Sequence, residues 1–244
     1  MRTLLWAERQ KLRRSNIVWL AVFATVMVAL IVFIGGKNAD YGSQYIDDAG
    51  WYMTMVQPWA TLLVLPAVIA LLGSYMICRE EEDDTIKSLR LIPINEVKLT
   101  TAKMIITFMF SVLIYLLLFA ITFLVEAMLH FSDLSAEMVL GFLKAYFLDG
   151  VGVFLAISPI VALVAHMKKS YWLALVITEM FSFAGTFMSM SNTLKTFYPI
   201  TAIFGVSGYY DTSTSQVILS CISLLLCGCL SAFILQGIKH SEES

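Results

Sequence analysis

Spacings that bind phosphate or metal are missing from this chain. Gly36 and Lys37 lack the upstream glycine and the following hydroxyl of a phosphate-binding loop, so nothing in the sequence indicates that the chain hydrolyses ATP. No His-Glu-x-x-His pattern occurs, and the three histidines are widely separated. The cysteines lie in or beside apolar runs, where small packing residues are expected rather than zinc ligands: Cys78, Cys221, Cys227 and Cys229. We expect no metal and no directly bound cofactor.

Ser207 lies in a short pattern typical of a nucleophile. Residues 205–208 read Gly-Val-Ser-Gly, which matches the Gly-x-Ser-Gly of rhomboid-type intramembrane serine proteases. A serine nucleophile needs a base within hydrogen-bond reach. His240, the only later histidine, is separated from Ser207 by a whole apolar run. His130 lies in a predicted outer loop, so its depth in the membrane does not rule it out as the base. An intramembrane serine protease is therefore kept as an alternative function.

Glu179 is an ionisable residue near the middle of the apolar run 171–190. Such a residue is costly within a bilayer and usually faces the interior of a bundle or a water-filled cavity. It could mark a substrate pathway or a proton-linked site. Alternatively, a neutral Glu179 forms hydrogen bonds with Ser182, Thr178 or a neighbouring helix. Without an identified partner, the second reading is preferred.

The elements that must position these residues are long apolar helices. Of the 244 residues, 59% are hydrophobic and 14% are charged, against about 25% charged in soluble domains. A helix needs about 20 predominantly apolar residues to cross the hydrocarbon core of a bilayer. The sequence predicts an all-α integral membrane protein of one domain, residues 1–244, with six spans at about 17–34, 56–78, 104–125, 141–165, 171–190 and 217–235.

A compact charged segment, residues 79–103, joins the second and third predicted spans. Acidic residues at its start suit the positive end of a helix dipole and can cap backbone N–H groups. Ile86 and Leu89 are three residues apart and share a face, and Pro93 ends the helix. Two readings stay open: a short helix that docks onto a partner protein, and a solvated loop that only fixes the topology.

The first residues of the chain, 2–15, predict a helix that lies along the membrane surface. Three of its arginines, Arg2, Arg9 and Arg13, line one face of the helical wheel. A neighbouring arc holds leucines together with one acid: Leu4, Leu5, Leu12 and Glu8. This amphipathic pattern is typical of interfacial helices. A basic anchor with no other role is the alternative.

Residues 191–215 form neither a clean span nor a polar loop. The segment is rich in aromatic and branched apolar residues, but Pro199, Gly205 and Gly208 interrupt it. An apolar segment too short and too broken to cross predicts a re-entrant excursion from the outer face. An ordinary interfacial loop is the competing prediction.

The distribution of basic residues predicts the orientation. With the amino terminus inside, 13 of the 16 Lys and Arg residues fall in the inner segments, whereas Lys37, Lys144 and Lys195 fall outside. Cytoplasmic loops carry such an excess of Lys and Arg. We therefore expect both termini to be cytoplasmic.

Two short patterns resemble those of the membrane subunit of type-2 ABC exporters. The first precedes span one and has the form Glu-x-x-Lys-Leu-x-x-Ser, with Glu8, Lys11, Leu12 and Ser15. The second occupies the first inner loop and opens the third span, with Glu80, Glu82, Thr85, Leu89, Pro93, Ala102 and Lys103. Within this family, the size of the chain and its loop are most similar to permeases of bacterial lantibiotic-immunity and bacitracin-resistance transporters.

The resemblance implies a transport subunit, not an enzyme, in the bacterial cytoplasmic membrane. A separate ATPase, in two copies, would bind ATP and Mg and receive the helix 82–92, with Glu80, Glu82, Thr85, Ile86, Leu89 and Pro93 as the coupling residues. The amino-terminal helix, with Glu8, Lys11 and Leu12, would brace that helix. A second permease, identical or related, would complete the pathway. The implied cargo is an amphipathic antimicrobial peptide, and no nucleic acid is involved. A non-transporting scaffold or sensor is a third reading.

Overall fold

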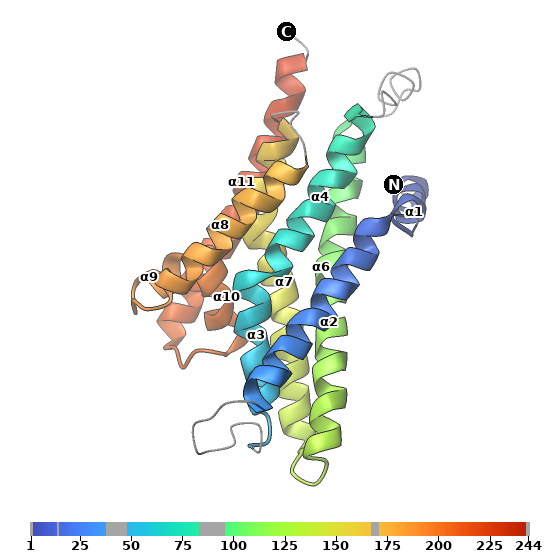
Figure 1. Ribbon diagram of the computed structural model, residues 1–244. Helices are drawn as coiled ribbons and strands as arrows, with labels where there is room; N and C mark the ends of the chain where they lie inside the picture. The colour runs from blue at the N-terminus through green and yellow to red at the C-terminus, as the bar shows by residue number, and fades with distance from the viewer. Residues whose placement is uncertain (1, 14, 38–47, 83–95, 167–170, 243–244) are drawn as a thin grey trace.

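The computed structural model describes residues 2–13, 15–37, 48–82, 96–166 and 171–242, and 88% of these are helical (Figure 1). The described residues contain no strand, so the all-α prediction is confirmed. In chain order the helices are α1 (Arg2–Arg13), α2 (Asn16–Lys37), α3 (Trp51–Leu63), α4 (Leu65–Glu82), α6 (Glu96–Leu129), α7 (Ala136–His166), α8 (Trp172–Met188), α9 (Leu194–Phe197), α10 (Pro199–Ser207) and α11 (Thr214–Glu242).

Four of these helices, α2, α6, α7 and α11, are each long and apolar enough to cross a membrane. Helices α3 and α4 pass the same test together, as one span bent by 46°. Helix α8 corresponds to the fifth predicted span, but its 17 residues are fewer than the roughly 20 that a bilayer requires. The described part of the chain thus supplies four candidate spans, or five with the bent pair, and the count of six stays a prediction.

The bend between α3 and α4 lies at Val64, whose φ of −133° and ψ of −57° are not helical. Pro66 follows within the first turn of α4. Proline has no N–H to donate to the preceding turn, and its ring displaces the carbonyl four residues earlier. The sequence predicts kinks at Pro58 and Pro66. Only Pro66 adjoins the break, because Pro58 lies inside the continuous helix α3.

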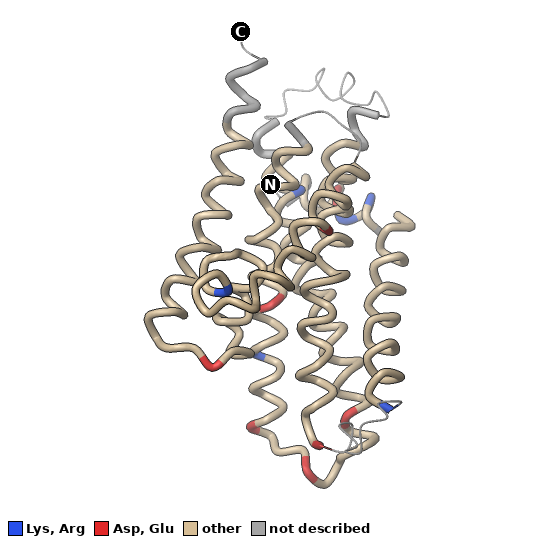
Figure 2. Tube along the Cα trace, turned by 60° about the vertical axis from the view of Figure 1, so that its left-hand side comes forward, with Lys and Arg blue, Asp and Glu red and all other residues tan. Residues whose placement is uncertain are grey.

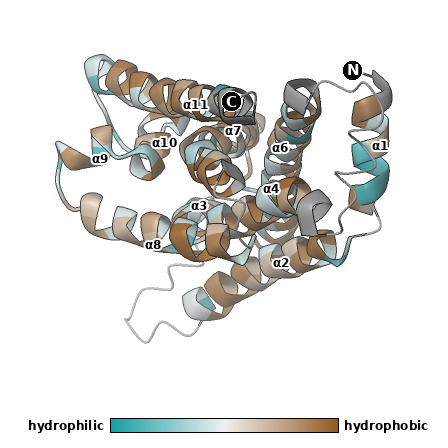
Figure 3. Ribbon diagram, turned by 90° about the horizontal axis from the view of Figure 1, so that it is seen from above, coloured by the Kyte–Doolittle hydropathy of each residue, from teal (hydrophilic) through white to brown (hydrophobic). Residues whose placement is uncertain are grey.

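Helix α7 lies at the centre of the bundle and contacts α4, α6, α10 and α11 (Figure 3). Its buried stripe repeats every four residues, through Val153, Ile157 and Val161, as an amphipathic helix requires. The helix begins at Ala136, five residues before the expected start of the span. Ser135 explains the earlier start, because its hydroxyl accepts a hydrogen bond from the Met138 N–H at 3.1 Å.

The segment before α11 folds into two short helices, α9 and α10. Helix α10 buries Ile200, Ile203 and Phe204 and contacts α7, α8 and α11. Gly208 ends it with a left-handed φ of 87°, a conformation that glycine adopts without strain. The burial of α10 among three longer helices favours the predicted re-entrant segment over a loop lying on the surface.

The two ends of the bundle differ in what they carry. One end, called here the α1 end, holds α1, the end of α4, the start of α6 and the end of α11 (Figure 1). The opposite end, called the far end, holds the connection between α6 and α7, where Figure 2 shows acidic residues. The described spans therefore place α1 and the two residues that border segment 83–95 on the same side.

Candidate functional site

The predicted coupling residues stand at the α1 end or lie outside the described residues. Helix α4 ends at Glu82 and α6 begins at Glu96, so Thr85, Ile86, Leu89 and Pro93 belong to the part that the structure does not describe. Glu80 and Glu82 lie in the last turn of α4. Because α1 contacts α6, the surface helix adjoins one border of the coupling segment.

Helix α1 is packed against the bundle through the residues of the first pattern. Glu8 is only 3% exposed and forms an ion pair with Lys11, with 2.7 Å between Lys11 Nζ and Glu8 Oε1. Leu12 is half-buried against the apolar core. On the opposite side Trp6 is 69% exposed, in the position of an interfacial anchor. A buried acid and a core leucine show that α1 is more than an exposed basic anchor.

Ser15, the last residue of the first pattern, joins α1 to α2. Its side chain is buried, and its hydroxyl accepts a hydrogen bond from the Ile17 N–H at 3.3 Å. This is the capping role that serine serves before a helix, since the first N–H groups of a helix have no partner within it. The pattern therefore encodes both the packed face of α1 and the start of α2.

One face of α3 is held by polar groups from α6 and α7. The acceptors and donors on α3 recur at helical spacing, at Gly50, Met53, Gln57 and Thr61. Their partners are, in the same order, Glu126 at 2.7 Å, Tyr146 at 2.7 Å, Asp149 at 2.8 Å and Tyr115 at 2.9 Å. All four partner side chains are completely buried. We call this row the polar column of α3, and it runs from the far end into the apolar part of the bundle.

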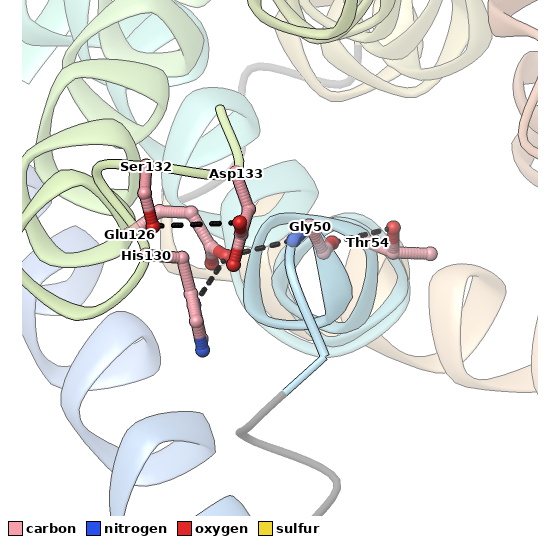
Figure 4. A network of polar contacts seen from close by, with 6 residues as sticks. All are labelled: Gly50, Thr54, Glu126, His130, Ser132 and Asp133. Atoms are coloured by element: carbon pink, nitrogen blue, oxygen red, sulfur yellow. Dashed lines mark hydrogen bonds and ion pairs between the residues drawn. The ribbon is translucent and has the colours of Figure 1, made fainter. Parts of the chain in front are cut away.

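Glu126 closes the polar column at the far end (Figure 4). Its Oε1 accepts a hydrogen bond from the Gly50 N–H and lies 3.0 Å from His130 Nδ1. The carboxylate therefore sits at the N-terminus of α3, where the helix dipole favours negative charge. Gly50 has a φ of 86°, which allows the turn into α3 without strain.

Replacing Glu126 by alanine is expected to lower the free energy of unfolding by about 1–3 kcal/mol. The change leaves the buried Gly50 N–H without its acceptor, and an unpaired buried donor costs about that much. Thermal unfolding in detergent measures the effect. Glu137→Ala is the matched control, because Glu137 is an exposed acid close by in the first turn of α7. Equal stability of the two variants would contradict the role of Glu126 as the acceptor that holds the start of α3.

The comparison with known proteins gives the family. Residues 4–185 match the model of a family described as ABC-2 family transporter protein. The chain belongs to the ABC-2 transporter family. The matched range contains α1 from Leu4 onward, the undescribed segment 83–95, and every residue of the polar column. Proteins of this family are membrane components rather than ATPases, so this ABC-2 chain is a multi-pass transporter permease.

One relative carries a more specific description. It is the bacitracin transport permease protein BCRB of Bacillus licheniformis, which is 22% identical over 149 residues. The similarity covers 61% of this ABC-2 chain and 71% of the relative.

Glu179 lies on α8 and is half-buried. Neither predicted partner bonds to it: Ser182 donates to the Thr61 carbonyl at 3.2 Å, and the buried Thr178 hydroxyl has no partner among the described residues. Ser182 instead ties α8 to the polar column of this ABC-2 permease. The role of Glu179 as a pathway residue stays a prediction.

Ser207 ends α10 in a setting unlike that of a protease nucleophile. Its buried hydroxyl has no hydrogen-bond partner within the described residues. His130, the histidine kept as its base, is held by Glu126 at the far end of α6. The ionisable group that Ser207 faces is the Asp149 carboxyl. His130 therefore does not activate the serine.

Sequence reasoning missed the polar column. Lys144 and Asp149 both fall within the predicted fourth span, yet Lys144 is exposed and Asp149 is completely buried. A signal was present, because Asp149 stands four residues before Val153 and thus continues the buried stripe of α7. Gln57 gave no comparable signal, since it is a lone polar residue in an apolar run.

Proposed function

We propose that this ABC-2 protein is the permease subunit of an ATP-driven exporter. The family match over residues 4–185 carries the proposal, and the packing of α1 beside the border of segment 83–95 supports it. ATP and Mg²⁺ would be bound by a separate ATPase, present in two copies. The α1 end would then face the cytoplasm of a bacterial cell, with both termini inside.

The proposed coupling contact is the helix 82–92, received in a groove on the ATPase surface. Glu80, Glu82, Thr85, Ile86, Leu89 and Pro93 would form or flank it, and α1 would brace it from α6. ATP-driven closure of the two ATPases would move the coupling helices and repack the spans between two arrangements. Two observations support the bracing role: Glu8 is buried, and α1 contacts α6, the helix that follows the coupling segment.

The cargo and the second half of the pathway are proposed as classes of molecule. Six spans form half of a transport path, so a second permease, identical or related, would complete it. The description of the relative as a bacitracin transport permease supports a peptide antibiotic of the bacitracin or lantibiotic class as cargo. Expulsion of such an amphipathic peptide from the outer leaflet would give the cell immunity or resistance.

Charging the apolar face of the coupling helix is expected to abolish capture of the ATPase. In a pull-down from detergent-solubilised membranes, Ile86→Glu/Leu89→Glu should retain at least tenfold less ATPase than the unchanged protein, a loss of about 1.4 kcal/mol or more. Burying two carboxylates in an apolar groove without partners accounts for the loss. Ser88→Glu adds a charge off that face and should retain the ATPase. If neither the unchanged protein nor either variant captures an ATPase, the exporter proposal is wrong.

A cargo assay separates the exporter from the two other readings. Cells that express this permease with its ATPase should survive a bacitracin-type peptide better than cells whose ATPase cannot hydrolyse ATP. Equal survival, with the ATPase still captured, would identify a scaffold or sensor. Labelling of Ser207 by a serine-reactive probe, with no need for ATP, would instead support the protease.

A further inference from the structure

Asp149 is a carboxyl group buried deep within a membrane-spanning helix. It follows Ala136 by 13 residues and precedes Val164 by 15, so about 20 Å of helix separates it from each end of the span. Its side chain is completely buried. Gln57 Nε2 donates to Oδ2 at 2.8 Å, but Oδ1 has no hydrogen-bond partner among the described residues. One carboxylate oxygen is thus buried and unsatisfied.

The groups that surround Asp149 are neutral. From α6 comes Tyr115, whose hydroxyl bonds to Thr61, and from α7 itself comes Tyr146, whose hydroxyl bonds to the Met53 carbonyl. From α3 comes the Gln57 amide. No ion pair within the described residues includes Asp149. An isolated buried carboxylate is strongly unfavourable, so its charge must be compensated by a cation or removed by a proton.

The C-terminal end of α10 faces the same carboxyl. Ser207 is the last residue of α10, and its buried hydroxyl is directed toward the Asp149 carboxyl without completing a close hydrogen bond to it. The last carbonyl oxygens of a helix carry the negative end of its dipole and favour a cation. Broken helices within membranes present such ends to Na⁺ or H⁺. The two orphan oxygens and the helix end therefore make one electronegative site between α7 and α10.

We propose that Asp149, Ser207 and the last turn of α10 bind one monovalent cation inside the membrane, either a proton on the Asp149 carboxyl or a sodium ion. A bound cation satisfies the orphan oxygens of both side chains at once. Its presence would hold α10 against α7, and its loss would leave a bare carboxylate beside the negative end of α10. This site does not involve the ATPase, so its test is independent of the exporter proposal.

Infrared spectroscopy of the purified protein in lipid nanodiscs tests the occupant directly. The carbonyl stretch of a protonated carboxyl is recorded at neutral pH in a sodium-free choline buffer for the wild type and for Asp149→Asn. A band present in the wild type and missing from Asp149→Asn shows a bound proton. Its loss on addition of sodium chloride shows that Na⁺ takes the same place. Glu179→Gln is the control, and it should leave the Asp149 band unchanged.

Thermal unfolding supplies the second measurement. If no Asp149 band appears, a sodium-dependent rise in the midpoint of unfolding, present in the wild type and absent from Asp149→Asn, shows a sodium site. Ligand that binds the folded state alone raises stability in this way. If both the Asp149 band and the sodium response are absent, the proposal is overturned. Should Asp149→Asn fail to fold, Ser207→Ala replaces it, and the band or the sodium response is then expected to shift.

Discussion

Gly150→Ala is expected to push α6 away from α7 and to lower the free energy of unfolding by roughly 1–3 kcal/mol. A Cβ at position 150 would lie 3.0 Å from the Val112 Cα and 3.2 Å from the Ser111 carbonyl oxygen. Backbone atoms cannot rotate away as a flexible side chain can, so one helix must move. The movement also disturbs the 2.6 Å hydrogen bond from the Ser111 hydroxyl to the Gly150 carbonyl.

Gly141→Ala is the matched control on the same helix. A Cβ at position 141 meets no atom within 4 Å, and the residue is exposed. Alanine favours a helix interior over glycine by about 1 kcal/mol, so this variant should unfold at the same or a higher temperature. Thermal unfolding of both variants in one detergent measures the difference. A Gly150→Ala protein as stable as Gly141→Ala would show that the close approach of α6 and α7 is not needed.

Glu8→Lys is expected to detach α1 from α6 and to weaken capture of the ATPase. The change places a cation where the side chain is 3% exposed and reverses the pair with Lys11. An uncompensated buried charge costs about 3–5 kcal/mol, which opposes the packed position of this 12-residue helix. The spans are separate from this contact and should stay folded.

Hydrogen exchange distinguishes detachment of α1 from general unfolding. In Glu8→Lys the backbone amides of α1 should lose protection, whereas those of α7 keep it, because local opening exposes only the amides of the opened unit. Arg9→Glu is the control, since Arg9 is exposed and its reversal leaves the packed face intact. Retained protection of α1 in Glu8→Lys would contradict the role of Glu8 as the buried contact.

Hydropathy predicted the helices well because the bilayer imposes their length and composition. The prolines predicted kinks at Pro58 and Pro66, and only Pro66 adjoins a break, because Pro58 lies within the continuous helix α3. The short pattern at Glu8, Lys11 and Leu12 likewise pointed to a surface helix, and the structure packs that helix against α6.

The polar column could not be predicted in the same way, because its bonds join residues far apart in the chain. Gln57 and Asp149 are 92 positions apart, and only the packing of α3 on α7 brings them together. A hydropathy window counts Asp149 only as an unfavourable charged residue, and it does not indicate that Gln57 will donate a hydrogen bond to it. Ile86 and Leu89, the strongest sequence-based coupling candidates, lie outside the described residues and stay predictions.

The break at Val64 divides the second span into halves that are held by different forces. The half formed by α3 is fixed by four directional hydrogen bonds, whereas α4 presents buried apolar residues such as Ile69 and Leu72 to its neighbours. Apolar contacts tolerate sliding that would break a hydrogen bond. We therefore expect a force applied at the Glu82 end to displace α4 more readily than α3, with the non-helical Val64 as the point where the two halves can bend.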